Sequence, residues 1–274
     1  MKRLPAAAKI NLALVVGPAR EDGLHEVVTV MQRIDLCDSV ELEPADSLSV
    51  EGLKEDTLVR TALATLATGA GVEPHWRARI RKRIPLAAGL GGGSADAAAA
   101  LALANPLLEH PLDHGHLQDV AAGIGADVPF FLDPGPKLAE GGGERLTPLD
   151  LPQDFWVVVA LPRRTRKNST ADVYARFDEA RGAEGYEERR AALDEALAAV
   201  RRPRDFAAFP ANDLALAAGR PPIADELLEH GAFRADVSGA GPAVYGLFHH
   251  QGDAKGAARR LRLAARTWVV APVW

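Results

Sequence analysis

A glycine-rich segment at residues 85–98 constrains this chain most strongly, because glycine fills four of the five positions 89–93. Residues 76–84 before it alternate apolar and basic side chains, as a half-buried strand does, and residues 94–105 contain seven alanines, which favour a helix. Glycine permits positive φ angles, and the start of a helix offers unpaired N–H groups to an anion. The order of strand, glycine loop and helix predicts a phosphate-binding loop. A hinge or tight turn is the simpler alternative, but it does not explain why a strong helix follows at once.

The loop matches none of the common nucleotide or nucleophile motifs. A P-loop needs Gly-Lys followed by Ser or Thr, and no lysine follows a glycine in this segment. The dinucleotide fingerprint needs a third glycine, whereas Ser94 stands three residues after Gly91. The esterase elbow needs a glycine two residues after its serine, where this chain has Asp96. The segment therefore predicts a phosphate cradle of another kind.

The composition is that of a folded, slightly acidic protein. Its 274 residues and 29.1 kDa allow one large domain or two modest lobes, and 47% hydrophobic residues with 25% charged residues is a globular mixture. A net charge of −5 argues against partners such as nucleic acid or an anionic membrane. The single cysteine, Cys37, excludes an internal disulfide and is compatible with a reducing cytoplasm. Lys9 and Asn11 interrupt the apolar N-terminal stretch, so we expect a mature N-terminus rather than a signal peptide.

Periodicity and turn residues predict a chain that mixes strands and helices. Strands are expected at 10–16, 27–34, 39–43, 76–84, 156–161, 243–248 and 267–270. Helices are expected at 58–69, 94–105, 117–124, 186–201, 213–218, 223–230 and 253–264, the first of them capped by Asp56 and Thr57. Residues 127–132 are expected to be extended, because a residue before proline avoids the helical region. The loop-like composition near 150 predicts an N-terminal domain of residues 1–150 and a C-terminal domain of residues 151–274.

Asp127 and Lys9 are the first candidates for chemistry. Asp127 lies between Ala126 and the apolar residues 128–131, so its carboxylate is expected to be partly buried and to need a partner or a function. Lys9 begins a similarly apolar strand and could be that partner. An ordinary aspartate at a helix end and a surface lysine are the alternative.

Five segments resemble one known family, the GHMP kinases. Residues 85–98 resemble its ATP-binding motif, and the triple glycine together with residues 8–12, 22–26 and 125–131 is similar to its 4-diphosphocytidyl-2-C-methyl-D-erythritol kinase branch. Residues 238–244 resemble the C-terminal glycine motif. The resemblance implies an α+β, two-lobe fold with ATP and substrate in the cleft between the lobes. It also implies phosphorylation of the substrate's 2-hydroxyl in the non-mevalonate (methylerythritol phosphate) isoprenoid pathway.

The same resemblance implies a kinase mechanism with ATP and Mg²⁺ as cofactors. Asp127 would take the proton of the substrate hydroxyl, while Lys9 would orient that hydroxyl and offset the charge of the moving phosphoryl group. The residues expected to bind the nucleotide are Lys82, Pro85, Leu86, Ala87, Ala88, Gly89, Leu90, Gly91, Gly92, Gly93, Ser94 and Ala95. A solvated strand lysine is the alternative for Lys82. Ala95 stands where many relatives have a second serine, and no metal-ligating side chain is expected.

Substrate recognition is also assigned through the resemblance. The residues expected to bind the substrate are Asn11, Leu24, His25, Thr170, Tyr174 and Gly239. His25 would hydrogen-bond the cytosine end and Tyr174 would cover one face of the base. Leu24 replaces the family's tyrosine on the other face, where it can pack but not stack. The partner would be a small cytidine diphosphate alcohol, and the protein would be a monomer or weak homodimer.

Two rival functions remain open. The chain could be another small-molecule kinase of this family, for homoserine, mevalonate or a sugar, or a noncatalytic nucleotide-binding or RNA-binding protein.

His110, His114 and His116 lie in a loop before a helix, where solvated side chains are expected rather than a metal site. The basic run at 163–167 is expected to be a solvated loop, with steering of a diphosphate as the alternative.

Overall fold

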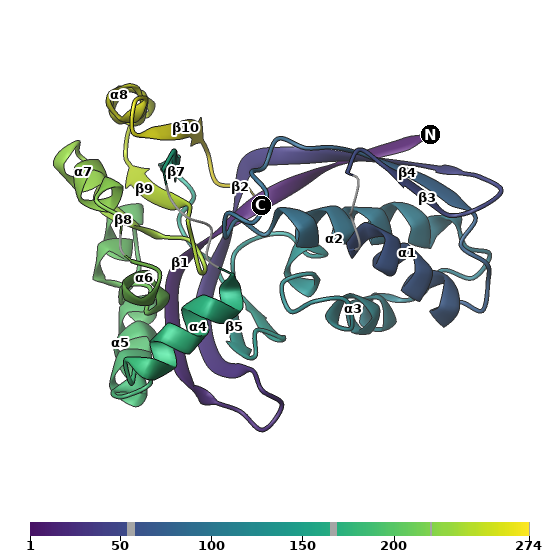
Figure 1. The fold of residues 1–274 in the computed structure, drawn as a ribbon, viewed down its shortest axis with the longest axis horizontal. Coiled ribbons are helices and arrows are strands. Elements are labelled where there is room, and N and C mark those ends of the chain that lie inside the picture. Colours follow the sequence, from purple (N-terminus) through teal and green to yellow (C-terminus); the bar gives the residue numbers. More distant parts are fainter. Residues whose placement is uncertain (54–57, 165–168, 220, 274) are drawn as a thin grey trace. The chain divides into compact units, whose positions relative to one another are not determined.

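The computed structural model describes residues 1–53, 58–164, 169–219 and 221–273, and these residues form two compact units (Figure 1). The first unit contains Met1–Ala8, Leu36–Leu86 and Gly91–Pro134. The second contains Lys9–Asp35, Ala87–Leu90 and Gly135–Trp274. Each unit draws on several segments, so the linear division at residues 150 and 151 stays a prediction.

Two long strands, β1 (Lys2–Ala19) and β2 (His25–Pro44), pair with each other and contribute residues to both units. The sequence predicts two short strands, 27–34 and 39–43, where the structure has the single strand β2. The prediction of a break was wrong because the polar residue Asp38 is buried within the strand. Its Oδ1 accepts the backbone N–H groups of Arg83 at 2.5 Å and Ile84 at 2.9 Å, which satisfies the carboxylate inside the fold.

In the first unit, a sheet face is covered by helices. Strand β4 (Trp76–Arg81) runs antiparallel to β2, with Val40 opposite Ile80, and β3 (Ser49–Glu51) adds in parallel at its edge. Alternation along β4 is as expected, because Trp76, Ala78 and Ile80 are buried and the arginines between them are exposed. The helical elements are α1 (Leu58–Gly69), α2 (Gly92–Ala104), η1 (Asn105–Leu107), α3 (His114–Ala122) and η2 (Pro129–Phe131). Alanines of α2 and leucines of α1 fill the core between them.

In the second unit, β5 (Lys137–Gly141) pairs with β2 and β6 (Arg145–Pro148) pairs with β5, both antiparallel. A separate antiparallel sheet has the order β10-β7-β9-β8 and consists of β7 (Trp156–Pro162), β8 (Arg234–Val237), β9 (Val244–Phe248) and β10 (Ala265–Val270). Helices α7 (Ile223–Glu229) and α8 (Gln251–Leu261) pack on this sheet. The remaining elements are α4 (Thr170–Glu179), α5 (Tyr186–Ala199), η3 (Pro203–Ala208) and α6 (Leu214–Ala217).

Most predicted helices are present with shifted ends, but two local predictions differ from the structure. Helix α4 was not predicted; a capping box between Ser169 and Asp172 begins it, and it buries Val173 and Phe177. The prediction that residues 127–132 are extended was wrong. Val128 is helical at φ −65° and ψ −43°, and a 3₁₀ turn follows, with Pro129 at its first position, where a missing N–H costs little. That turn buries both Val128 and Phe130 completely.

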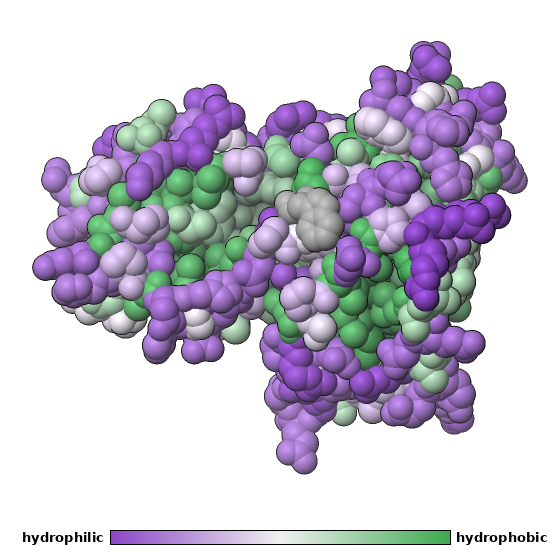
Figure 2. Space-filling view, turned by 180° about the vertical axis from the view of Figure 1, so that it is seen from behind, coloured by the Kyte–Doolittle hydropathy of each residue, from purple (hydrophilic) through white to green (hydrophobic). Residues whose placement is uncertain are grey.

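The surface follows the usual division of residue types. Figure 2 shows hydrophilic residues projecting outward and hydrophobic residues gathered in the more recessed areas of that face. No helix in the described part of the chain is both long enough and apolar enough to cross a bilayer. The predicted cap of the first helix, Asp56 and Thr57, lies outside the described residues.

Candidate functional site

The start of α2 is open to an anion. Gly91 precedes the helix in the left-handed conformation, at φ 68° and ψ 16°, and provides no side-chain cap. The first hydrogen bond of the helix runs from Ala95 N to Gly91 O at 2.9 Å. The N–H groups of Gly92, Gly93 and Ser94 therefore have no acceptor within the helix, and the helix dipole adds positive potential at the same place. This geometry suits a phosphate group.

Two glycines of this turn also have a packing reason. A Cβ added at Gly92 would lie 2.9 Å from Ile84 Cγ2, and one added at Gly93 would lie 2.9 Å from Leu58 Cδ1. Both distances are shorter than normal van der Waals contact. The backbone here is therefore pressed against its neighbours on one side, as a cradle that approaches a ligand on the other side would be.

The first half of the loop, residues 87–90, belongs to the second unit and is held through three successive carbonyls. Ala88 O accepts from Ala243 N at 3.0 Å, and Leu90 O accepts from Lys9 N at 2.9 Å. Between them, Gly89 O accepts from Ser238 Oγ at 2.8 Å. The C-terminal glycine motif and the start of the Lys9 segment, far apart in sequence, therefore fix the same loop. Pro85 and Leu86 lie before these anchors, and the Leu86 side chain is exposed.

Lys82 joins two aspartates at the base of α2. Its Nζ lies 2.6 Å from Asp96 Oδ2 and also contacts Asp38 Oδ2, and both carboxylates are fully buried. Burial acts to lower the pKa of Lys82, but Asp96 and Asp38 outweigh it, so the pKa is raised. The alternative of a solvated strand lysine was therefore wrong, whereas contact with adenine stays a prediction. Asp38 and Asp96 were missed, although a lone aspartate among the alanines of α2 was a usable signal.

Lys9 and Asn11 lie on β1 and are linked by their side chains. Lys9 Nζ donates to Asn11 Oδ1 at 2.8 Å, and Asn11 Nδ2 donates to Thr29 Oγ1 at 2.8 Å. All three side chains are at most 5% exposed, so the alternative of Lys9 as a surface lysine was wrong. Thr29 is a residue of this group that the sequence did not single out.

Asp127 lies in the first unit, in the turn that leads into η2, and is half-buried as expected. Lys9 belongs to the second unit, and the predicted pairing of Lys9 with Asp127 stays a prediction.

The expected base-binding residues gather around His25. The ring centroids of His25 and Tyr174 are 4.7 Å apart, and His25 Nε2 lies 2.8 Å from Asp178 Oδ1. Leu24 is 52% exposed and Thr170 is the exposed first residue of α4. Asp178 was missed, because nothing in the sequence distinguishes it from other helix-surface acids.

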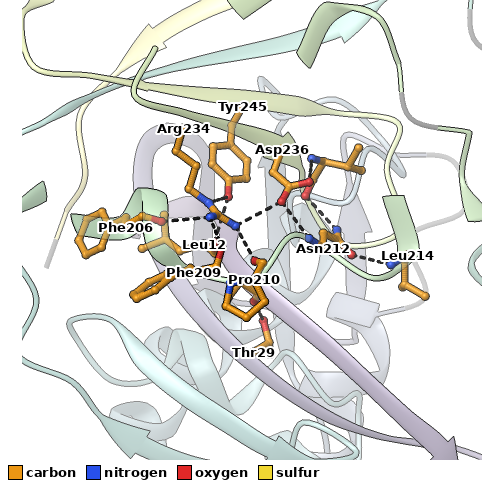
Figure 3. Close-up of polar contacts among 12 residues, drawn as sticks. Leu12, Thr29, Phe206, Phe209, Pro210, Asn212, Leu214, Arg234, Asp236 and Tyr245 are labelled. Atoms are coloured by element: carbon orange, nitrogen blue, oxygen red, sulfur yellow. Dashed lines mark hydrogen bonds and ion pairs between the residues drawn. The ribbon is translucent and has the colours of Figure 1, made fainter. Parts of the chain in front are cut away.

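A buried polar network supports the C-terminal glycine motif (Figure 3). Arg234 donates to the carbonyl oxygens of Phe206, Phe209 and Pro210, to Tyr245 Oη and to Asp236 Oδ2. Asp236 accepts the backbone N–H of Asn212 at 2.9 Å. Asn212 Nδ2 in turn donates to Gly239 O at 2.7 Å, which holds the left-handed Gly239 in place. None of the network residues except Gly239 was predicted, because their role comes from their partners in the fold.

The signals set aside in the sequence have ordinary surroundings where the structure describes them. His114 and His116 are exposed and pair with Asp133 and Asp113 respectively. No group of three or more His, Cys, Asp or Glu side chains in the described ranges is placed to hold a metal ion. Of the basic run at 163–167, residues 165–167 lie outside the described residues.

Comparison with known proteins identifies the family to which this chain belongs. Residues 57–135 match the family model for the GHMP kinases N terminal domain, and residues 221–266 match the model for the GHMP kinases C terminal region. A 4-diphosphocytidyl-2-C-methyl-D-erythritol kinase of Salinispora tropica is 40% identical, with 96% of this chain and 86% of the relative covered. A 4-diphosphocytidyl-2-C-methyl-D-erythritol kinase of Geobacter sulfurreducens is 38% identical, with 98% of this chain and 97% of the relative covered. The chain belongs to the 4-diphosphocytidyl-2-C-methyl-D-erythritol kinase family.

Solved structures agree with this family. A crystal structure of a 4-(cytidine 5'-diphospho)-2C-methyl-D-erythritol kinase superposes with a TM-score of 0.81 at 33% identity and covers all of both chains. A mevalonate kinase superposes with a TM-score of 0.77 at 13% identity, covering 100% of this chain and 99% of that one, which shows the shared fold alone. The predictions of an α+β GHMP kinase fold and of membership in this kinase family are confirmed.

Proposed function

We propose that this chain phosphorylates the 2-hydroxyl of 4-diphosphocytidyl-2-C-methyl-D-erythritol, with ATP as the donor and Mg²⁺ as its counterion, in the non-mevalonate isoprenoid pathway. The observation that carries the proposal is the open start of α2 after the glycine loop, where no side chain caps the helix and Gly92 packs against Ile84. The names of the full-length relatives supply the substrate.

The residues present fit a nucleoside triphosphate. The N–H groups of Gly92, Gly93 and Ser94, which have no acceptor within the helix, would bind phosphate oxygens, and Gly91 has no side chain that could cap them. Mg²⁺ usually binds to substrate phosphates together with one or two carboxylates and water, so the phosphates would supply part of its ligands. When bound, it would neutralise charge that develops on the transferred group.

In this reaction the chain would align the substrate hydroxyl with the phosphoryl group and accept one proton. The carboxylate of Asp127 would accept the proton of the substrate hydroxyl, whose oxygen then bonds to the γ-phosphorus of ATP while the bond to the β–γ bridging oxygen breaks and ADP leaves. The ammonium of Lys9 would orient the hydroxyl and offset negative charge. How the ligands lie relative to the two units stays a prediction.

The cluster around His25 supports recognition of the cytosine base. Tyr174 lies against the His25 ring, so an aromatic face and a hydrogen-bonding edge are offered together. Leu24, at 52% exposure, is free to cover a flat ligand when one binds. We propose that Asn11, Thr170 and Gly239 contact the rest of the substrate.

We further propose that the protein works in the cytoplasm as a monomer or weak homodimer, without a nucleic-acid or membrane partner. The support is the net charge of −5 and the single cysteine.

The deciding experiment is coupled ADP release with Mg-ATP and a panel of alcohols. The panel contains 4-diphosphocytidyl-2-C-methyl-D-erythritol, the same compound without its cytidine, homoserine and mevalonate. Turnover with the cytidylated compound alone is expected. Turnover with another alcohol alone would move the chain to a different substrate, and silence with all four would favour a noncatalytic nucleotide-binding protein.

Replacement of Asp127 by asparagine tests the proton acceptor. We expect Asp127→Asn to fold normally and to lose at least about a hundredfold in kcat, because general-base catalysis typically contributes 10²–10⁴-fold. The matched control is Asp119→Asn, an exposed aspartate on α3 of the same unit, which should leave kcat unchanged. Near-normal kcat in Asp127→Asn would remove the residue from this role.

A further inference from the structure

Thr29 completes a chain of three buried side chains that begins at Lys9. Thr29 lies on β2 and is labelled in Figure 3. Its Oγ1 donates to Ala13 O at 2.7 Å and accepts from Asn11 Nδ2 at 2.8 Å. Asn11 Oδ1 accepts from Lys9 Nζ at 2.8 Å. The four residues belong to the same compact unit, so the chain of contacts lies within one body.

The direction of each hydrogen bond in this chain is forced by chemistry. A backbone carbonyl can only accept, so the single hydrogen of the Thr29 hydroxyl points to Ala13 O. The hydroxyl oxygen must then accept from Asn11, which turns the NH₂ group of the amide toward Thr29. The amide oxygen of Asn11 is thereby left facing the ammonium of Lys9, which can only donate.

The oxygen end and the NH₂ end of an asparagine amide have nearly the same shape, so shape alone does not decide which end faces which neighbour. The Lys9 ammonium binds the oxygen end of the amide and the Thr29 hydroxyl binds the NH₂ end, so without that hydroxyl the Asn11 NH₂ group would lose its acceptor. A buried donor without an acceptor is costly, so the amide would shift toward another acceptor and the Lys9 ammonium bonded to it would shift with it. The hydroxyl of Thr29 thus fixes the position of the amide to which the Lys9 ammonium is bonded.

We propose that Thr29 is a positioning residue for phosphoryl transfer, which acts by fixing the Asn11 amide and, through it, the ammonium of Lys9. This inference rests on the proposed kinase function, in which Lys9 orients the accepting hydroxyl. It assigns Asn11 a supporting role toward Lys9 in addition to its proposed contact with substrate.

The first test compares two variants with the wild-type enzyme. Thr29→Val keeps the shape and removes the hydroxyl; kcat should fall about tenfold or more, because small displacements of aligned groups are costly in rate. The KM values for ATP and for the cytidylated alcohol should change much less, since neither ligand loses a direct contact. Thr29→Ser, which restores the hydroxyl, should regain most of kcat.

A control separates positioning from the general loss of a threonine hydroxyl that donates to a backbone carbonyl. Thr267 lies on β10, and its Oγ1 also donates to a backbone carbonyl, Ala258 O, at 3.3 Å. Thr267→Val should leave kcat unchanged. If the Val methyl at position 29 disturbs folding, Thr29→Ala removes the same hydroxyl without adding bulk, and circular dichroism identifies which variants are folded.

A double-mutant cycle tests the route through Asn11. If Thr29 acts through Asn11, Thr29→Val should lower kcat in the wild-type background and have almost no effect in an Asn11→Ala background. Equal effects in both backgrounds would overturn the proposal.

A readout without substrate keeps the inference separate from the choice of reaction. The Asn11 side-chain amide and the Lys9 ¹⁵Nζ signal, assigned with Asn11→Ala and Lys9→Met, should shift in Thr29→Val and stay in place in Thr267→Val. Unchanged signals would overturn the proposal even if the kinase is active. Shifted signals in a protein that does not turn over the cytidylated alcohol would uphold the positioning and reject the proposed substrate.

Discussion

Single buried polar atoms decide much of the local structure of this protein. Arg234 is 7% exposed, yet its guanidinium has acceptors in three backbone carbonyls, a tyrosine hydroxyl and the Asp236 carboxylate. A buried charge without such partners would be strongly destabilising. Tyr245 is part of the same network: its hydroxyl accepts from Arg234 and donates to Leu12 O at 3.2 Å.

Tyr245 should make stability depend on alkaline pH. Burial raises the pKa of Tyr245 to about 12, although the Arg234 guanidinium acts in the opposite direction. The folded state therefore keeps a proton that the unfolded state releases near pH 10, so this contribution is complete below pH 10 and is lost between pH 10 and 12. We expect the loss to be about 1.4 kcal/mol per pH unit in that window.

Urea unfolding at pH 9, 10 and 11 measures this effect. Tyr245→Phe should have a lower free energy of unfolding at pH 9, because Leu12 O and Arg234 lose a partner, and a smaller fall between pH 10 and 11 than the wild type. The other two tyrosines are present in both proteins and cancel in the comparison. Parallel pH curves would contradict the assignment.

Helix α2 shows how one element combines a ligand site with a structural anchor. Its first turn leaves N–H groups for an anion, while Asp96, which follows that turn, is fully buried against Lys82. Asp38 on β2 holds the same lysine and the backbone of Arg83 and Ile84. The strand, the lysine and the helix start are thus fixed to one another in the first unit, which pre-orders the phosphate-binding turn.

Removal of the lysine from this anchor should be severe. Lys82→Met leaves two buried carboxylates without their counter-charge, which typically costs about 3–5 kcal/mol. Urea unfolding at pH 7 measures it, with Lys255→Met as the control, since Lys255 is exposed and its hydrogen bond to Gln251 Oε1 lies at the surface. A loss below about 1 kcal/mol would show that the aspartates are solvated or protonated instead.

The protein forms two compact units, and the segments that build them alternate along the single chain. The glycine loop contributes residues 87–90 to one unit and residues from Gly91 onward to the other, and β1 and β2 do likewise. A ligand at this loop therefore adds its binding free energy to the stability of the folded protein.

Mg-ATP should accordingly raise the melting temperature. At 100 times the dissociation constant the gain is about 2.7 kcal/mol, or about 5–10 °C for a chain of this size. Gly92→Ala should lose most of the shift, because its Cβ would lie 2.9 Å from Ile84 Cγ2 and displace the turn. Differential scanning fluorimetry with and without Mg-ATP measures both proteins.

Gly256→Ala is the control for this comparison. Gly256 lies within α8 and nothing is within 4 Å of an added Cβ, so the variant should keep the full shift. It should itself be more stable by about 0.5–1 kcal/mol, because alanine loses less conformational freedom in a helix. An equal ATP shift in Gly92→Ala would place the nucleotide elsewhere.

The sequence by itself determined the glycine loop, the strand before it and the helix after it, because glycine content, alternation and alanine content act locally. It also determined the family, since its motifs span most of the chain. Only the tertiary structure decided that β2 continues through Asp38, that residues 127–131 turn helically and that Lys82 pairs with two buried aspartates. It alone assembled Arg234, Asn212 and Gly239, and Lys9, Asn11 and Thr29. These features depend on hydrogen-bond partners that lie far apart in the chain, and polar residues show no periodicity that would reveal such partners.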